Sequence, residues 1–272
     1  MMPFEQKTDR LERARLLEQL TIEAWPPQVL EALDGWKLRA ASGVSRRANS
    51  VWAVGPFPES GAGNDWLAQA ESFAARNGID ACFYVSETSP AGLDEHLQLA
   101  GYALSEPCYL MAGSAKLSLE RIAARPAVAQ CGEITFSLPR PNHRSENEAW
   151  LQQFTELKKV PAEREPIYAS IFEAIRADKC FASLRIDGKV AALGTVVSQG
   201  NFGYISNLMV SPNYRRRGLA ACMMGELTRW AIERGAAELY LQVLQDNVAA
   251  VRLYQTLGFD IVARHHYRVL QG

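Results

Sequence analysis

The chain contains 272 residues, 48% of them hydrophobic, and its 29 Lys and Arg against 30 Asp and Glu give a formal net charge of -1. This composition is that of an ordinary globular protein and excludes disordered, collagen-like and highly charged chains. The charge balance provides no overall field that would attract nucleic acid or an anionic membrane. The N-terminus has no apolar signal segment, no apolar run reaches the ~18 residues of a membrane span, and the cysteines form no C-x-x-C pair. We therefore expect a soluble, cytoplasmic protein without a metal centre.

The first half of the chain predicts a helix followed by alternating strands and helices. Apolar residues at near-helical spacing in a Glu- and Arg-rich segment predict an amphipathic helix that ends near Pro26. These apolar positions are Leu11, Leu16, Leu20 and Ile22. Strands are expected at residues 36–40, 50–54, 81–85 and 102–112, and helices at residues 65–76 and 91–99.

The second half repeats this order of elements with clearer turn signals. Asp187–Gly188 is a typical hairpin pair and Gly200 marks a second turn, so the residues around them predict an antiparallel meander. Its strands are expected at residues 181–186, 190–197 and 204–210. A loop at 211–217, helices at 219–233 and 248–257, and strands at 238–243 and 261–270 complete this half.

A shift of 157 positions aligns the two halves without a gap from about residue 54 to residue 102. Gly78 then falls on Gly235, and Gly101 falls on Gly258, at the expected ends of equivalent helices. Two copies of one structural unit would place these glycines in register. The expected domains are residues 1–114 and 132–272, and residues 115–131 connect them through a partly helical segment.

A basic turn between an expected strand and an expected helix is the sharpest local signal. Arg215, Arg216 and Arg217 precede Gly218, and Ala220 follows at the start of the helix. A helix that begins with small residues presents unpaired N–H groups and the positive end of its dipole to an anion. We therefore expect a diphosphate site here, and the alternative is a solvated basic loop. Neither the G-x-x-x-x-G-K-[ST] loop nor the G-x-G-x-x-G loop occurs in the chain.

Two further motifs accompany the basic turn. Leu208–Val210 has the form L-x-V at the end of the preceding strand, and downstream the chain reads Asn247-x-x-Ala250-x-x-Leu253-Tyr254-x-x-x-Gly258-Phe259. Together with Arg215–Ala220, which matches [QR]-x-x-G-x-[GA], they resemble the GCN5-related N-acetyltransferase (GNAT) superfamily over residues 132–272. The resemblance implies an α/β fold with a mixed, mostly antiparallel central sheet flanked by helices. The first half resembles the degenerate N-terminal copy of tandem members.

The resemblance implies that the matching residues bind acetyl-CoA or take part in catalysis. The strand end would separate from its neighbour, leaving backbone groups for the pantetheine arm and an N–H for the thioester oxygen. The turn would bind the pyrophosphate, and Asn247 would contact the pantetheine, although an N-cap role is equally expected. Tyr254 would protonate the departing thiolate, since a phenol with a pKa of about 10 stays protonated at neutral pH; the alternative is a core tyrosine. The implied cofactor-binding residues are Leu208, Met209, Val210, Arg215, Arg216, Arg217, Gly218, Leu219, Ala220, Asn247, Ala250 and Tyr254.

The first half departs from these motifs at the positions that carry their chemistry. Under the same shift, Pro58 and Glu59 replace the first two arginines, Pro90 replaces the asparagine, and Leu97 replaces the tyrosine. We therefore expect the N-terminal copy not to bind coenzyme A productively. Its polar segment, residues 45–50, is expected to be a solvated turn, or else to contact the substrate or the other domain.

The sequence leaves open which group deprotonates the acceptor amine. Members of the superfamily often carry a carboxylate on the strand before the signature, but Asn207 stands there, and an amide cannot accept a proton. The candidates are His265 or His266 on the last strand and Glu148 or Glu156 in the helical region ahead of the meander. An amine of low pKa that arrives neutral would need no strong base.

The leading hypothesis is an acetyl-CoA-dependent N-acetyltransferase that acetylates a primary amine, on a small molecule or a peptide, by direct attack in a ternary complex. A non-catalytic acyl-CoA sensor or scaffold is the alternative. A nucleic-acid module is disfavoured because aromatic residues do not alternate with the basic run. The acceptor pocket is expected between the two halves or against the helices around residues 148–177.

Overall fold

The structure, a computed structural model, describes residues 4–58, 66–125, 133–137 and 144–270. Its first half begins with the expected helix α1 (Phe4–Ala24), but Leu16 is exposed and the buried face runs through Ala14 and Leu17. Strand β1 was not expected, and Glu59 lies outside the described residues. The other elements are β1 (Val29–Leu33), β2 (Trp36–Ala40), the 3-10 turn η1 (Arg46–Ala48), β3 (Val51–Trp52), α2 (Trp66–Arg76), β4 (Cys82–Ser86), α3 (Leu93–Leu99) and β5 (Ala103–Ser114).

The second half begins with helix α4 (Ala115–Ala123), within the segment expected to connect the domains. The Ser114 hydroxyl caps this helix by accepting a hydrogen bond from the Leu117 amide. The elements that follow are β6 (Glu133–Ser137), α5 (Arg144–Lys158), η3 (Ala162–Arg164), α6 (Glu165–Ala174), β7 (Asp178–Ile186), β8 (Lys189–Gln199), β9 (Phe202–Val210), η4 (Pro212–Tyr214), α7 (Leu219–Ile232), β10 (Glu238–Leu244), α8 (Val248–Thr256) and β11 (Asp260–Val269).

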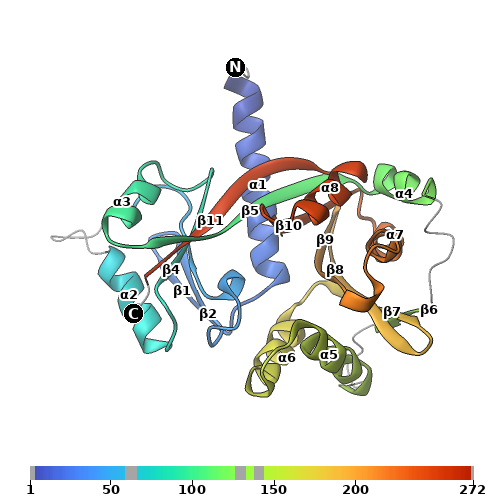
Figure 1. Cartoon of the computed structure of the whole chain (residues 1–272). Coiled ribbons are helices and arrows are strands. Elements are labelled where there is room, and N and C mark those ends of the chain that lie inside the picture. Colours follow the sequence, from blue (N-terminus) through green and yellow to red (C-terminus); the bar gives the residue numbers. More distant parts are fainter. Residues whose placement is uncertain (1–3, 59–65, 126–132, 138–143, 271–272) are drawn as a thin grey trace.

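The strands of these described residues form one 11-stranded sheet in the order β1-β2-β3-β4-β11-β5-β10-β9-β8-β7-β6 (Figure 1). Neighbouring strands are antiparallel except for two parallel pairs, β3 with β4 and β9 with β10. The expected α/β class, with a mixed and mostly antiparallel sheet flanked by helices, is confirmed.

The two halves exchange their last strands at the centre of this sheet. Strand β5 ends the first half but pairs with β10 of the second, while β11 ends the second half but pairs with β4 of the first. The exchanged strands also pair with each other, and in Figure 1 both run as long strands from one half to the other. Since sheet hydrogen bonds join the halves on both sides of this centre, the sheet is continuous.

The internal repeat appears as identical helix ends. After α2, the Ile79 amide donates to the Ala74 carbonyl, and after α7 the Ala236 amide donates to the Ala231 carbonyl. Likewise Tyr102 donates to Leu97 after α3, and Phe259 donates to Tyr254 after α8. Each pair of bonds is related by the 157-residue shift. The glycine inside each loop has a positive φ, as this type of cap requires; these glycines are Gly78, Gly235, Gly101 and Gly258.

Helices cover both faces of the sheet in the second half. Tyr204 and Ile205 are neighbours on β9 and point to opposite faces. Ile205 packs in a core with α4, α7 and α8, whereas Tyr204 packs in a core with α1, α5 and α6. Trp25, just beyond α1, meets Phe172 of α6 with ring centroids 5.3 Å apart. Among the described residues, no helix is long and apolar enough to cross a membrane.

Candidate active site

Strands β9 and β10 are paired over only part of their length. Their parallel register ends at Tyr204 and Tyr240, although β9 continues to Val210 and β10 to Leu244. A bulge at Asn207, with φ of 53°, shifts the register of β9 against β8 and accompanies this separation. The end of β9 therefore faces a gap in the sheet, where its backbone can pair with an extended ligand, as the resemblance implied for Leu208, Met209 and Val210.

The basic turn after β9 has the form of an anion site. Arg216 has a φ of 63° and Gly218 a φ of 80°, a left-handed pair of positions that turns the chain into α7. The first helical bond is donated by Cys222 to the Gly218 carbonyl, so the amides of the first turn have no acceptor within the helix. No acidic residue lies in that turn. The turn therefore combines open N–H groups with a positive helix end, which is the chemistry a diphosphate requires.

The three arginines of the turn are exposed to solvent. The guanidinium of Arg217 lies 5.4 Å from the centre of the Tyr214 ring, and no carboxylate of the described residues pairs with any of the three. Uncompensated guanidinium groups beside open amides fit the phosphates of coenzyme A.

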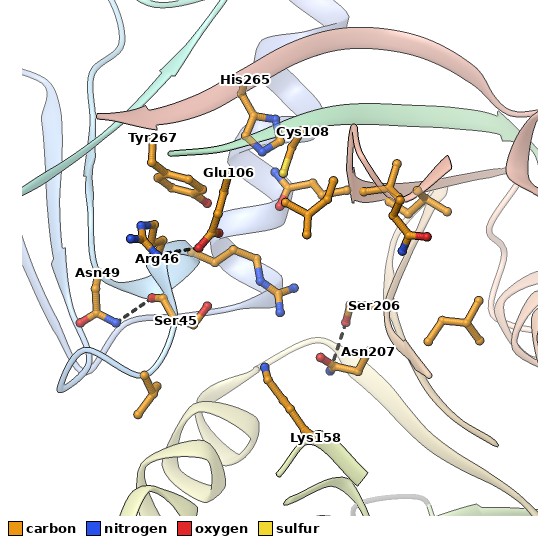
Figure 2. A pocket seen from close by; sticks show the side chains of 18 of the residues that line it. Ser45, Arg46, Asn49, Glu106, Cys108, Lys158, Ser206, Asn207, His265 and Tyr267 are labelled. Carbon is orange, nitrogen blue, oxygen red and sulfur yellow. Dashed lines mark hydrogen bonds and ion pairs between the residues drawn. The ribbon is translucent and has the colours of Figure 1, made fainter. Parts of the chain in front are cut away.

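A cleft of about 620 Å³ lies between the two halves, and we call it the central cleft (Figure 2). The second half supplies the end of β9, part of β10 and α8, including Leu208, Met209, Asn247 and Tyr254. The first half supplies the loop around η1 and the middle of β5, including Arg46, Arg47, Asn49, Glu106 and Cys108. The cleft therefore joins the residues implied for the thioester to a wall from the degenerate half, in the place expected for the acceptor.

Tyr254 and Asn247 both reach the central cleft from α8. Tyr254 is 7% exposed, and burial raises the pKa of its phenol to about 12. The hydroxyl is therefore protonated across the physiological range, as an acid requires. Asn247 caps α8 by accepting a hydrogen bond of 3.3 Å from the Ala250 amide, and the side chain is exposed at the cleft, so capping leaves its amide group able to donate.

The candidate bases occupy different surroundings. His265 lines the central cleft, but burial lowers its pKa to about 3, which makes it a weak base. His266 points to the other face of the sheet, where its Nε2 lies 2.7 Å from a carboxylate oxygen of Asp94 on α3. Glu148 and Glu156 are exposed on α5 and do not line the cleft. The structure thus brings only His265 to the site, in a form poorly suited to accept a proton.

The charged lining of the central cleft comes partly from a segment for which the sequence left two roles open and partly from a lysine that the sequence did not single out. Arg46 pairs with Glu106 at 2.6 Å (Figure 2), and Arg47 donates a hydrogen bond of 3.1 Å to the Tyr204 hydroxyl. Lys158, the last residue of α5, reaches the cleft from the second half. The sequence left residues 45–50 open between a solvated turn and a contact with the substrate or the other domain, and Arg46, Arg47 and Asn49 of this segment line the cleft. Nothing in the sequence distinguishes Lys158 from an ordinary exposed lysine.

The first half carries no equivalent site in its described part. Leu97, at the position equivalent to Tyr254, is fully buried in an apolar core with Trp66 and Phe83. The position equivalent to Asn247 is Pro90, which has neither an amide side chain nor an N–H. These replacements keep the fold and remove the polar groups.

Comparison with known proteins agrees with this geometry. The Acetyltransferase (GNAT) family model matches residues 144–259. An uncharacterized N-acetyltransferase of Bacillus subtilis (strain 168), YobR, is 33% identical over 258 residues, covering 94% of this chain and 98% of that protein. A GCN5-related N-acetyltransferase from Kribbella flavida is similar in structure, with a TM-score of 0.68 at 19% identity, 95% of each chain being covered. A tandem GNAT protein from the clavulanic acid biosynthesis pathway has a TM-score of 0.52 at 15% identity, over 75% of this chain and 68% of that one. The chain therefore belongs to the GNAT family of acetyl-CoA-dependent acyltransferases.

Proposed function

We propose that the protein transfers the acetyl group of acetyl-CoA to a primary amine by direct attack in a ternary complex. The observation that carries this proposal is the continuity of one cleft, lined by both the open end of β9 and a polar wall from the other half. A donor stretched along β9 and an acceptor against that wall would meet beside Tyr254. No covalent enzyme intermediate is required, because holding the two reactants together supplies much of the rate enhancement.

The binding roles follow the geometry of the second half. The amides at the start of α7, from Gly218 to Ala220, and the guanidinium groups of Arg215–Arg217 would hold the pyrophosphate. The backbone of Leu208–Val210 would pair with the pantetheine amides and direct one N–H at the thioester oxygen. Asn247 and Ala250 would contact the pantetheine from α8.

Tyr254 would act as the acid in the transfer step. The amine nitrogen forms a bond to the thioester carbonyl carbon, the C–S bond breaks, and the sulfur takes the proton of the Tyr254 hydroxyl. The acetylated nitrogen loses one proton to solvent, and the phenolate takes one back. Because His265 is a weak base and Asn207 cannot accept a proton, we propose that the amine reaches the site unprotonated.

The N-terminal half would contribute acceptor binding and no second cofactor site. We propose that residues 1–114 and 132–272, with residues 115–131 between them, are the two units of the internal repeat. The equivalence of their helix ends supports the repeat, and the arginine-rich wall around η1 supports the acceptor role.

An acceptor panel tests the proposal directly. The full chain is incubated with acetyl-CoA and primary amines that include amino acids, polyamines, peptides and aminoglycosides, and thiol release is followed. We expect turnover on at least one class of amine and acetylation of its nitrogen by mass spectrometry. Tight binding of coenzyme A without turnover on any of them would favour the acyl-CoA sensor.

A further inference from the structure

We propose that the acceptor carries an anionic group, a carboxylate or a phosphate, beside its amine, and that Arg47 and Lys158 bind this group in the central cleft. The inference rests on the proposed function and specifies the class of its substrate. The same chemistry would serve the carboxylate of an amino acid or the phosphate of an aminoalkyl phosphate.

The central cleft has an excess of positive charge. Among the described residues that line it, the cations are Arg46, Arg47, Lys158 and Arg164, and the acids are Asp80 and Glu106. Arg46 and Glu106 neutralise each other in an ion pair of 2.6 Å. Arg47, Lys158 and Arg164 form no ion pair with any carboxylate of the described residues. Asp80 is exposed, so the cations that remain without a counterion dominate the cleft.

The fold holds the Arg47 guanidinium in place. The group stacks 3.9 Å from the centre of the Trp25 ring and donates one hydrogen bond to the Tyr204 hydroxyl. A guanidinium has five N–H donors, so most of them are unused by these contacts. An arginine fixed by neutral partners keeps its charge for a ligand, and its planar donors match a carboxylate or a phosphate.

Lys158 approaches the same space from the opposite half. Its Nζ lies 4.9 Å from the Tyr168 ring centre and 5.3 Å from that of Phe154, and Figure 2 shows the side chain pointing from α5 into the cleft. Although much of the side chain is exposed, desolvation by these surroundings, together with the charge of Arg47, lowers the pKa of Lys158 to about 8. An anion bound between Arg47 and Lys158 would relieve this repulsion.

The phosphates of coenzyme A do not account for these cations. Arg215, Arg216 and Arg217 surround the start of α7, and none of them lines the central cleft. Arg47 is hydrogen-bonded instead to Tyr204 of β9, before the bulge at Asn207, and Lys158 lines the same cleft, whereas the diphosphate turn lies beyond Val210. The chain therefore has one group of cations at the proposed diphosphate site and another in the proposed acceptor space.

Matched amine pairs test the inference on the full chain with acetyl-CoA. Leucine is compared with leucinamide, and phosphoethanolamine with ethanolamine, so that the two arms separate a carboxylate from a phosphate. We expect the anionic member of at least one pair to have a kcat/KM at least about 10-fold higher, the scale of one charge-assisted hydrogen bond. Amidation lowers the pKa of the amine and so increases its neutral fraction, which works against this result.

Substitutions of Arg47 and Lys158 test whether these two residues cause the preference for anionic amines. Arg47→Gln and Lys158→Gln are expected to reduce the ratio of anionic to neutral kcat/KM toward one, and Arg47→Lys is expected to retain part of it. Lys116→Gln, on the exposed face of α4 and outside the cleft, is the matched control and should leave the ratio unchanged. Equal or higher kcat/KM for the neutral members, or a preference that neither variant reduces, would overturn the inference.

Calorimetry separates this inference from the proposed function. If no amine is acetylated, the transferase proposal fails. The inference is then tested by comparing how tightly the anionic and the neutral member of each pair bind to the protein loaded with coenzyme A. Tighter binding of the anionic member, lost in Arg47→Gln, supports it. Equal binding of both members refutes it.

Discussion

The burial, position and protonation of Tyr254 are compatible with two roles, that of a proton donor in the reaction and that of a packed tyrosine of the core. Its ring packs against Phe259 with centroids 5.9 Å apart, yet its residue lines the central cleft. A pKa of about 12 keeps the phenol fully protonated at neutral pH but weakens it as a proton donor. Because an ordinary thiol has a pKa of about 8.5, transfer to the departing thiolate is uphill, and the acid role requires that desolvation in the site make the thiolate more basic.

Replacing Tyr254 by Phe separates the two roles. Tyr254→Phe keeps the ring and its packing and removes only the hydroxyl. We expect kcat to fall about 100-fold, the scale of general acid catalysis, with the Kd for coenzyme A changed less than about twofold. Steady-state kinetics and calorimetry measure the two quantities. Tyr109→Phe, a half-buried tyrosine of β5 outside the cleft, serves as control, and a kcat of Tyr254→Phe equal to that of wild type would exclude the acid role.

His265 makes the stability of the fold sensitive to acid. It stacks on Tyr84 with ring centroids 4.6 Å apart, and its Nδ1 is buried without a hydrogen-bond partner. Its pKa of about 3 in the folded protein lies below the ordinary value of about 6.5, so the unfolded chain takes up a proton first as the pH falls. Folding stability is therefore fully present above pH ~7 and decreases as the pH falls from about 6.5 toward 3.

The comparison with His265→Phe isolates this effect. Phenylalanine retains the stacking and removes the titration, so the free energy of unfolding of the variant relative to wild type should rise by up to about 1.4 kcal/mol for each pH unit below 6.5. Urea unfolding at pH 7, 6 and 5 measures the difference. A difference that is constant with pH would show that His265 titrates normally in the folded protein.

At the scale of the elements, the exchanged strand β5 depends on a glycine. A Cβ built on Gly113 would lie 2.5 Å from the carbonyl oxygen of Gly258 and 3.1 Å from the Cα of Phe259. Both are backbone atoms, which cannot move without shifting the end of α8 or β11. Gly194 on β8 is also crowded, but there a Cβ would meet side-chain atoms of Leu227 and Met223, at 2.8 and 3.0 Å.

The two glycines predict unequal costs of substitution. Gly113→Ala should lower the free energy of unfolding by about 1–3 kcal/mol, because the backbone must be displaced. Gly194→Ala should cost less, because its neighbours can change rotamer. Chemical denaturation of both variants provides the comparison, and an equal or larger loss for Gly194→Ala would contradict the expectation.

Most elements could be predicted from the sequence because their signals are local. Asp187–Gly188 and Gly200 predicted the two turns of the meander, and the glycines at equivalent helix ends indicated the repeat. The buried side of α1 was not predictable, because it is set by contact with β9 and β11 and includes the charged Glu18, 2% exposed and hydrogen-bonded to Thr88 at 2.6 Å. For the same reason the sequence could not decide whether residues 45–50 form a solvated turn or the N-terminal wall of the cleft.

At the scale of the whole molecule, strand exchange couples the two halves. In the part of the chain that the structure describes, strand β11 pairs only with β4 and β5, and both lie within residues 1–114. Of the described strands, β5 in turn pairs only with β10 and β11, and both lie beyond residue 132. A repeat boundary in the sequence therefore does not define two units that fold separately.

Expression of the two fragments tests this dependence. Residues 1–114 and 115–272 made alone should each lack a stable cooperative fold, because each contains a long strand without a partner. When mixed, they should recover the secondary structure and the coenzyme A affinity of the intact chain. Circular dichroism, size-exclusion chromatography and calorimetry report the outcome. A monomeric 115–272 fragment that unfolds cooperatively and binds coenzyme A by itself would contradict the prediction.

The central claim is that the start of α7 binds the diphosphate of the acyl donor while the end of β9 holds its pantetheine arm. A crystal structure of the full chain with coenzyme A is the most direct measurement. The account predicts phosphate oxygens within hydrogen-bond distance of amides between Arg216 and Ala220, with the thiol end beside Tyr254. Coenzyme A bound elsewhere, or lying with its diphosphate away from this turn, would contradict it.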